Sequence, residues 1–159
     1  KFRERDTMEG AREVAFKIKE YRPAVSFVDE VGVDAGVVDR LRQLGHTVIG
    51  INAGEKADDP DTYYNKRVEM WARMRQWLRD GGDIPHDRDL RSSLVGIEYG
   101  YAGQTSDGER IRLERKSDMK KRGLDSLDEG DSLAYTFSHE VAPNFETNSL
   151  GPSDFEPEY

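Results

Sequence analysis

The sequence contains no cysteine among its 159 residues, which excludes a disulfide framework and any zinc site built on thiolates. No apolar run approaches the length needed to cross a membrane, and no signal peptide is recognisable. Hydrophobic residues make up only 35% of the chain, the same share as the charged residues. These deficits favour one small domain with a solvated surface, since a chain of this length can still bury a core.

Positive charge is also in deficit, because the formal net charge is -8 at pH 7. This balance argues against a general nucleic-acid coat, which would be basic. It does not exclude a nuclease, whose active site is itself a cluster of acids. The chain begins at Lys1 and not at Met, so we expect a processed protein or a piece of a longer one.

The first third of the chain predicts a strand–helix–strand unit. A helix ends before Pro23, and residues 24–28 form an apolar run that is too short for a helix and indicates a buried strand. Asp34 then opens a helix that ends at Gly45, and residues 46–51 form the next strand. Short connections of this kind make the two strands parallel neighbours.

The middle of the chain predicts a loop and then the strongest helix, over residues 64–78. Its apolar stripe is interpreted as core. For Arg67 and Glu69 two interpretations stay open, a place in the motif quoted below or a polar helix face. The stripe and its neighbours are Val68, Trp71, Met74 and Leu78, with Met70 and Trp77 beside them. A short helix over 88–94 follows.

Two strands, 96–101 and 110–113, predict a β-hairpin whose mobile tip covers 102–109. A last helix runs from Ser126 or Asp128 to Phe137. The composition of the end of the chain predicts disorder, which divides the chain into a domain over 1–139 and an acidic tail over 140–159.

Three acids stand where a metal site is expected. Asp29 follows the first strand, and ligands of open α/β sheets lie beyond the carboxyl ends of strands. Asp128 and Asp131 are three residues apart, which places both on one face of the last helix. Carboxylate oxygens suit Mg²⁺ and Mn²⁺, and two such ions form the apparatus of phosphodiester hydrolysis. The alternative is structural: Asp29 helps to cap the next helix, and the helix dipole favours the other two acids.

A basic run precedes the last helix and is a candidate for contacts with DNA phosphates. The alternative is a solvated helix face. Its four candidate residues are Lys116, Lys120, Lys121 and Arg122.

Five segments resemble one known family in their residues and in their order. They are VDEVGVDAGVVDRL (28–41), YNKRVEMW (64–71), WLRDGGDIP (77–85), KSDMKKRG (116–123) and SLDEGDSLA (126–134). Together they resemble the C-terminal nuclease domain of the large subunit of bacteriophage DNA-packaging terminases. The resemblance implies an α/β fold with a ribonuclease H-like mixed sheet flanked by helices.

The same resemblance implies the chemistry and the setting. Asp29 matches the family's second catalytic acid, and Asp128 and Asp131 match its late acidic motif, with the principal ligand of the two left open. The site would hold two Mg²⁺ or Mn²⁺ ions and cleave concatemeric double-stranded DNA. The implied partners are DNA, the phage portal and the small terminase subunit, in the host cytoplasm and without a membrane.

The sequence also departs from the family. Leu127 replaces the usual Pro, and Asp34 replaces a Gly. The family's first catalytic Asp lies on an opening strand, and no such strand precedes Thr7. We therefore expect a nuclease domain that lacks its opening strand, carries an added β-hairpin and is weak or inactive alone. The rival hypothesis is a non-catalytic module that binds DNA or the portal.

Overall fold

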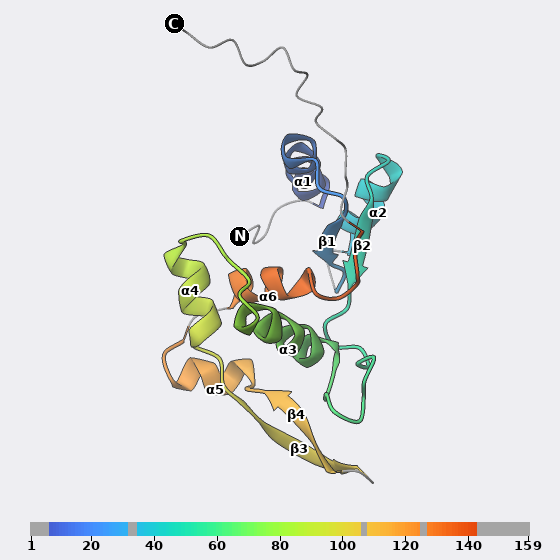
Figure 1. The fold of residues 1–159 in the computed structure, drawn as a ribbon. Coiled ribbons are helices and arrows are strands. Elements are labelled where there is room, and N and C mark those ends of the chain that lie inside the picture. Colours follow the sequence, from blue (N-terminus) through green and yellow to red (C-terminus); the bar gives the residue numbers. More distant parts are fainter. Residues whose placement is uncertain (1–6, 32–34, 106–107, 125–126, 143–159) are drawn as a thin grey trace, which may run out of the picture.

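The computed structural model describes residues 7–31, 35–105, 108–124 and 127–142 (Figure 1). Predictions that concern Asp34, Ser126 and the segment 143–159 lie outside these residues. No described helix is both long enough and apolar enough to cross a membrane. The described elements are α1 (Thr7–Tyr21), β1 (Ser26–Asp29), α2 (Ala35–Gln43), β2 (Val48–Ile51), α3 (Lys66–Arg79), α4 (Arg88–Val95), β3 (Tyr99–Thr105), β4 (Gly108–Leu113), α5 (Lys116–Lys121) and α6 (Asp128–Tyr135).

The first two strands are parallel neighbours, as the sequence predicts, with Ser26 opposite Val48 and Asp29 opposite Ile51. Both strands are shorter than predicted. The ladder is bounded by two backbone hydrogen bonds, from Ser26 N–H to Thr47 O (3.0 Å) and from Glu30 N–H to Ile51 O (3.1 Å). Asp29, which was expected directly after the strand, is therefore the last residue of β1.

Helices α1 and α2 pack on this strand pair through one apolar cluster. Gly45 follows α2 with φ +81°, the left-handed conformation that ends many helices, which confirms its predicted position. Leu44 lies just beyond the end of the helix at Gln43 and is 47% exposed. The buried members of the cluster are Ala11, Ala15, Val37, Val38, Leu41 and Val48.

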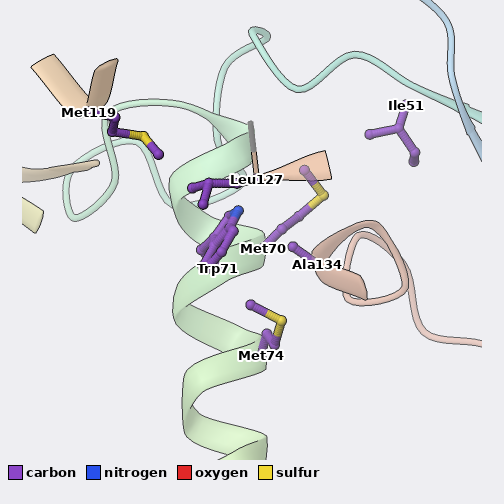
Figure 2. Packing of buried hydrophobic residues seen from close by; sticks show 7 residues of the cluster. All are labelled: Ile51, Met70, Trp71, Met74, Met119, Leu127 and Ala134. Atoms are coloured by element: carbon purple, nitrogen blue, oxygen red, sulfur yellow. The ribbon is translucent and has the colours of Figure 1, made fainter. Parts of the chain in front are cut away.

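Helix α3 supplies the centre of the second cluster, which confirms the interpretation of its stripe as core (Figure 2). Trp77 lies at the margin: it is 38% exposed and packs on the ring of Phe137 with centroids 5.5 Å apart. The buried members are Ile51, Met70, Trp71, Met74, Met119, Leu127 and Ala134. This cluster joins α3, α5 and α6 to the end of β2.

One face of α3 is more buried than a polar helix face would be. Glu69, for which a polar helix face was one interpretation, is only 2% exposed. Its carboxylate accepts the backbone N–H groups of Asp58 (2.9 Å) and Asp59 (3.4 Å). It also pairs with Lys66 (3.5 Å) and Arg73 (2.8 Å). The loop before α3 folds over this face, and that is why the acid is buried.

The hairpin is antiparallel and longer than predicted. Residues 102–105 and 108–109, expected in a mobile tip, continue the two strands, and residues 106–107 between them lie outside the described part. Ile111 anchors β4 to the loop before α3, because its N–H donates to Thr62 O (2.8 Å) and its carbonyl accepts from Tyr64 N–H (3.0 Å). The hairpin and the β1–β2 pair lie at opposite ends of the fold, with α3 and α6 between them (Figure 1).

Candidate acidic site

Asp29 joins the end of β1 to the last helix. One carboxylate oxygen, Oδ1, accepts the N–H of Val31 at 2.9 Å, which forms a local turn. The other, Oδ2, accepts the hydroxyl proton of Tyr135 at 2.9 Å. The side chain thus holds α6 against the carboxyl end of the strand, and within the described part of the chain each of its oxygens accepts one hydrogen bond.

Asp131 lies at the junction of α6 with α3, where three N–H groups converge on it. Arg67 donates through Nε to Oδ1 (2.8 Å) and through Nη2 to Oδ2 (3.1 Å), a bidentate pair. The indole N–H of Trp71 donates to Oδ1 at 2.8 Å. Both charged side chains are largely buried, with 13% of Asp131 and 16% of Arg67 exposed. Charge and hydrogen bonding of Asp131 are therefore already compensated by the protein.

Tyr135 connects the two acids, because it follows Asp131 by four residues and so lies on the same face of α6. Burial raises the pKa of its hydroxyl well above the ordinary value, and the hydrogen bond to Asp29 and the charges of Asp29 and Asp131 add to this. The positive charge of Arg67 acts against the rise in pKa. We call Asp29, Tyr135, Asp131 and Arg67 the Asp29–Asp131 network.

Asp128 is half-buried in the first turn of α6, three residues before Asp131. Asp29 contacts the same helix through Tyr135. Among the described residues, however, no three His, Cys, Asp or Glu side chains come together in a way that suits a metal ion. As carboxylates, Asp29 and Asp128 belong to the ligand type that divalent cations prefer. The carboxylate of Asp131 already accepts hydrogen bonds from Arg67 and Trp71. The role of the three acids as metal ligands stays a prediction.

Of the four residues predicted to contact DNA phosphates, Lys121 and Arg122 are paired with acidic side chains of the protein. Lys120 and Lys121 are exposed, and Lys121 pairs with Asp118 at 2.7 Å. Arg122 donates to Glu114 (2.9 Å) and to Glu98 (2.7 Å), and this pairing lowers the pKa of the Glu114 carboxyl. The side chain of Lys116 lies outside the described part. Arg122 therefore fastens α5 to the hairpin, and its contact with DNA stays a prediction.

Sequence reasoning missed one member of the site and misjudged two others. Trp71 was interpreted as core alone, Arg67 as either a motif residue or a polar face, and Tyr135 was not singled out. A signal was present, because Arg67 and Trp71 are four residues apart, as are Asp131 and Tyr135. Two pairs at this spacing indicate two helix faces, but not that the faces meet.

The raised pKa of Tyr135 gives a test at alkaline pH. Because the folded-state pKa exceeds the unfolded value of about 10, the hydroxyl's contribution to stability is complete below that pH and is lost as pH rises through the folded pKa. Urea unfolding midpoints should therefore fall more steeply above about pH 10 in the natural chain than in Tyr135→Phe. Parallel pH profiles for the two proteins would contradict the buried hydrogen bond.

The sequence matches no protein-family model and no curated protein. The solved structures that match define a class of fold: the chain has the fold of a large-terminase nuclease domain. They are structures of the nuclease domain of the large terminase subunit gp2 of bacterial virus Sf6. A lysine-to-alanine variant with manganese has a TM-score of 0.61 and 17% identity over 87% of this chain and 76% of that chain.

Two further structures of the same domain agree with this fold. The variant with manganese and beta-thujaplicinol has a TM-score of 0.59, and the unaltered domain has 0.58. Each is 18% identical over 84% of this chain and 73% of that chain. The resemblance predicted from the five sequence segments is thus confirmed at the level of the fold.

Proposed function

We propose that this chain is the nuclease domain of a phage DNA-packaging motor and hydrolyses double-stranded DNA with divalent metal ions. The observation that carries the proposal is the contact of Asp29, at the carboxyl end of β1, with the helix that holds Asp128 and Asp131. It occurs on the fold of a terminase nuclease domain, two of whose matched structures were solved with manganese. In this role the substrate is concatemeric DNA, and the portal and small terminase subunit are partners in the host cytoplasm.

In this proposal some side chains bind the metal ions and others position them. Asp29 and Asp128 would hold the cations, since carboxylate oxygens are the ligands that hard cations prefer. Two bound Mg²⁺ or Mn²⁺ ions would supply an activated water and stabilise the leaving oxygen. Tyr135 orients Asp29 through its hydrogen bond, and Arg67 fixes Asp131 and with it the first turns of α6. Carboxylates from further parts of the protein would complete the set.

The second candidate is a module that binds DNA or the portal without cutting. It is favoured by the bidentate pairing of Asp131 with Arg67, and by the lack of a three-acid metal group among the described residues.

The deciding experiment is plasmid nicking with Mn²⁺ or Mg²⁺, with and without a chelator. We expect the 159-residue chain to nick weakly, because the sequence predicts no strand with the family's first catalytic Asp before Thr7 and the metal ions would be poorly positioned. Misplacing catalytic groups by about 1 Å can cost on the order of a hundredfold in rate. A protein extended upstream by its own gene should nick strongly. The chelator should abolish nicking by both. If the extended protein binds DNA but leaves the plasmid intact in Mn²⁺, the chain is a non-catalytic binding module and the nuclease proposal is wrong.

A further inference from the structure

A small basic pocket lies where the start of α3 meets the end of β4. Its volume is about 190 Å³, and its lining includes three arginines, Arg67, Arg112 and Arg115, together with Tyr64 and Asn65. No Asp or Glu lines it. In a chain with a net charge of -8, three guanidinium groups around one hollow are an exception to the general surface. They point to an anionic ligand.

The pocket retains unused hydrogen-bond donors. The ion pairs of the described residues do not include Arg112 or Arg115. Arg67 uses Nε and Nη2 for Asp131, and within the described part its Nη1 donates to no protein acceptor. Asn65 accepts from Val68 N–H through its side-chain oxygen (3.1 Å), which leaves its NH₂ group as a donor. Three arginines and an amide therefore offer donors that the protein itself leaves unused.

The ring of Tyr64 contacts two arginine side chains, Arg110 and Arg112. It lies 5.2 Å from the guanidinium carbon of Arg110 and 5.7 Å from that of Arg112, and the Tyr64 side chain is 47% exposed. Cation–π attraction of this kind orients guanidinium groups without neutralising them. Arg110 is not part of the pocket lining, and among the described residues its buried Nε has no hydrogen-bond partner.

We propose that this pocket binds a phosphate of the nucleic-acid backbone. Planar guanidinium groups match phosphate oxygens in pairs, and such contacts position a duplex without reading its sequence. Arg67 lines the pocket and also holds Asp131, so a phosphate there lies beside the Asp29–Asp131 network. The inference rests on the proposed function for its choice of DNA, and it adds Tyr64, Arg112 and Arg115 to the exposed lysines predicted from sequence.

The test measures DNA affinity without metal, so that it does not depend on cleavage. A short fluorescent duplex is titrated in chelator with the full chain, Arg112→Gln, Arg115→Gln and Arg91→Gln. Arg91 is an exposed arginine of α4, so its variant removes the same charge elsewhere. Each pocket variant should weaken binding about tenfold and lower the salt slope by about one, while Arg91→Gln stays within about twofold.

Two further arms separate the source of the phosphate and the effect of charge. Arg112→Lys keeps the charge but loses the paired geometry, so its affinity should fall between those of the natural chain and Arg112→Gln. Inorganic phosphate should compete with DNA for the natural chain and not for the Arg112→Gln, Arg115→Gln double variant. A phosphate-induced rise in Tm with unchanged DNA affinity in the variants would overturn the DNA assignment.

The outcomes also separate this proposal from the nuclease proposal. Equal losses in Arg91→Gln and the pocket variants, or no loss in any, would overturn the pocket even if the extended protein nicks DNA. Weakened binding in the pocket variants alone would support it even if Mn²⁺-dependent nicking never appears. Circular dichroism spectra and unfolding midpoints of the variants confirm that the fold is kept.

Discussion

Replacing Asp29 with asparagine is expected to lower Mn²⁺-dependent nicking by the upstream-extended protein on the order of a hundredfold or more, with the fold unchanged. Asparagine keeps the shape of the side chain: its oxygen can accept the N–H of Val31, and its NH₂ group can donate to the hydroxyl oxygen of Tyr135. It loses the negative charge with which Asp29 would hold a hard cation. Initial nicking rates at saturating Mn²⁺, measured beside the unfolding midpoint of each protein, separate a chemical loss from a folding loss.

The matched control for this variant is Asp39→Asn. Asp39 is an acid of α2 whose side chain is 75% exposed and lies 4.0 Å from Arg42, so its loss removes one charge and little structure. Nicking by Asp39→Asn should stay near that of the natural sequence. Equal nicking by Asp29→Asn and the natural sequence would remove Asp29 from the mechanism. Equal losses in both variants would point to a general effect of charge.

Replacing Glu69 with alanine is expected to lower the free energy of unfolding by about 3–5 kcal/mol, the cost of breaking a buried charge pair. The change leaves Lys66, whose side chain is 6% exposed, with Asp58 alone as its acidic partner. It also removes the acceptor of the N–H groups of Asp58 and Asp59. Because a domain is stable by only about 5–15 kcal/mol, urea unfolding should show a large shift of the midpoint.

Arg73→Ala is the control within the same ion network. Arg73 contacts Glu69 and Asp58, but its side chain is 41% exposed, so water screens the pair. Its loss should cost about 1 kcal/mol or less. A similar cost for the two variants would show that Glu69 behaves as a surface acid and that burial adds nothing to its pairing.

Local chemistry alone determined much of the fold. The short apolar run before Asp29, the glycine at position 45 and the stripe on α3 gave the parallel strand pair, the end of α2 and the second core. Each feature depends on residues within one or two turns of chain, so spacing and turn chemistry are sufficient to predict it. The position of Asp29 at a strand end, and hence the edge where a site was expected, follows in the same way.

The partners of the acids were decided only by tertiary structure. The Tyr135–Asp29 hydrogen bond joins residues 106 positions apart, and the Arg67–Asp131 pair joins residues 64 apart. Spacing along one helix shows which side chains share a face, but the packing of that face against another element sets what they meet. Packing between distant segments also explains why Glu69 is buried under the loop before α3 and why Arg122 pairs with Glu98. Sequence placed the charges, and long-range packing decided which of them are already paired and which keep donors or acceptors for a ligand.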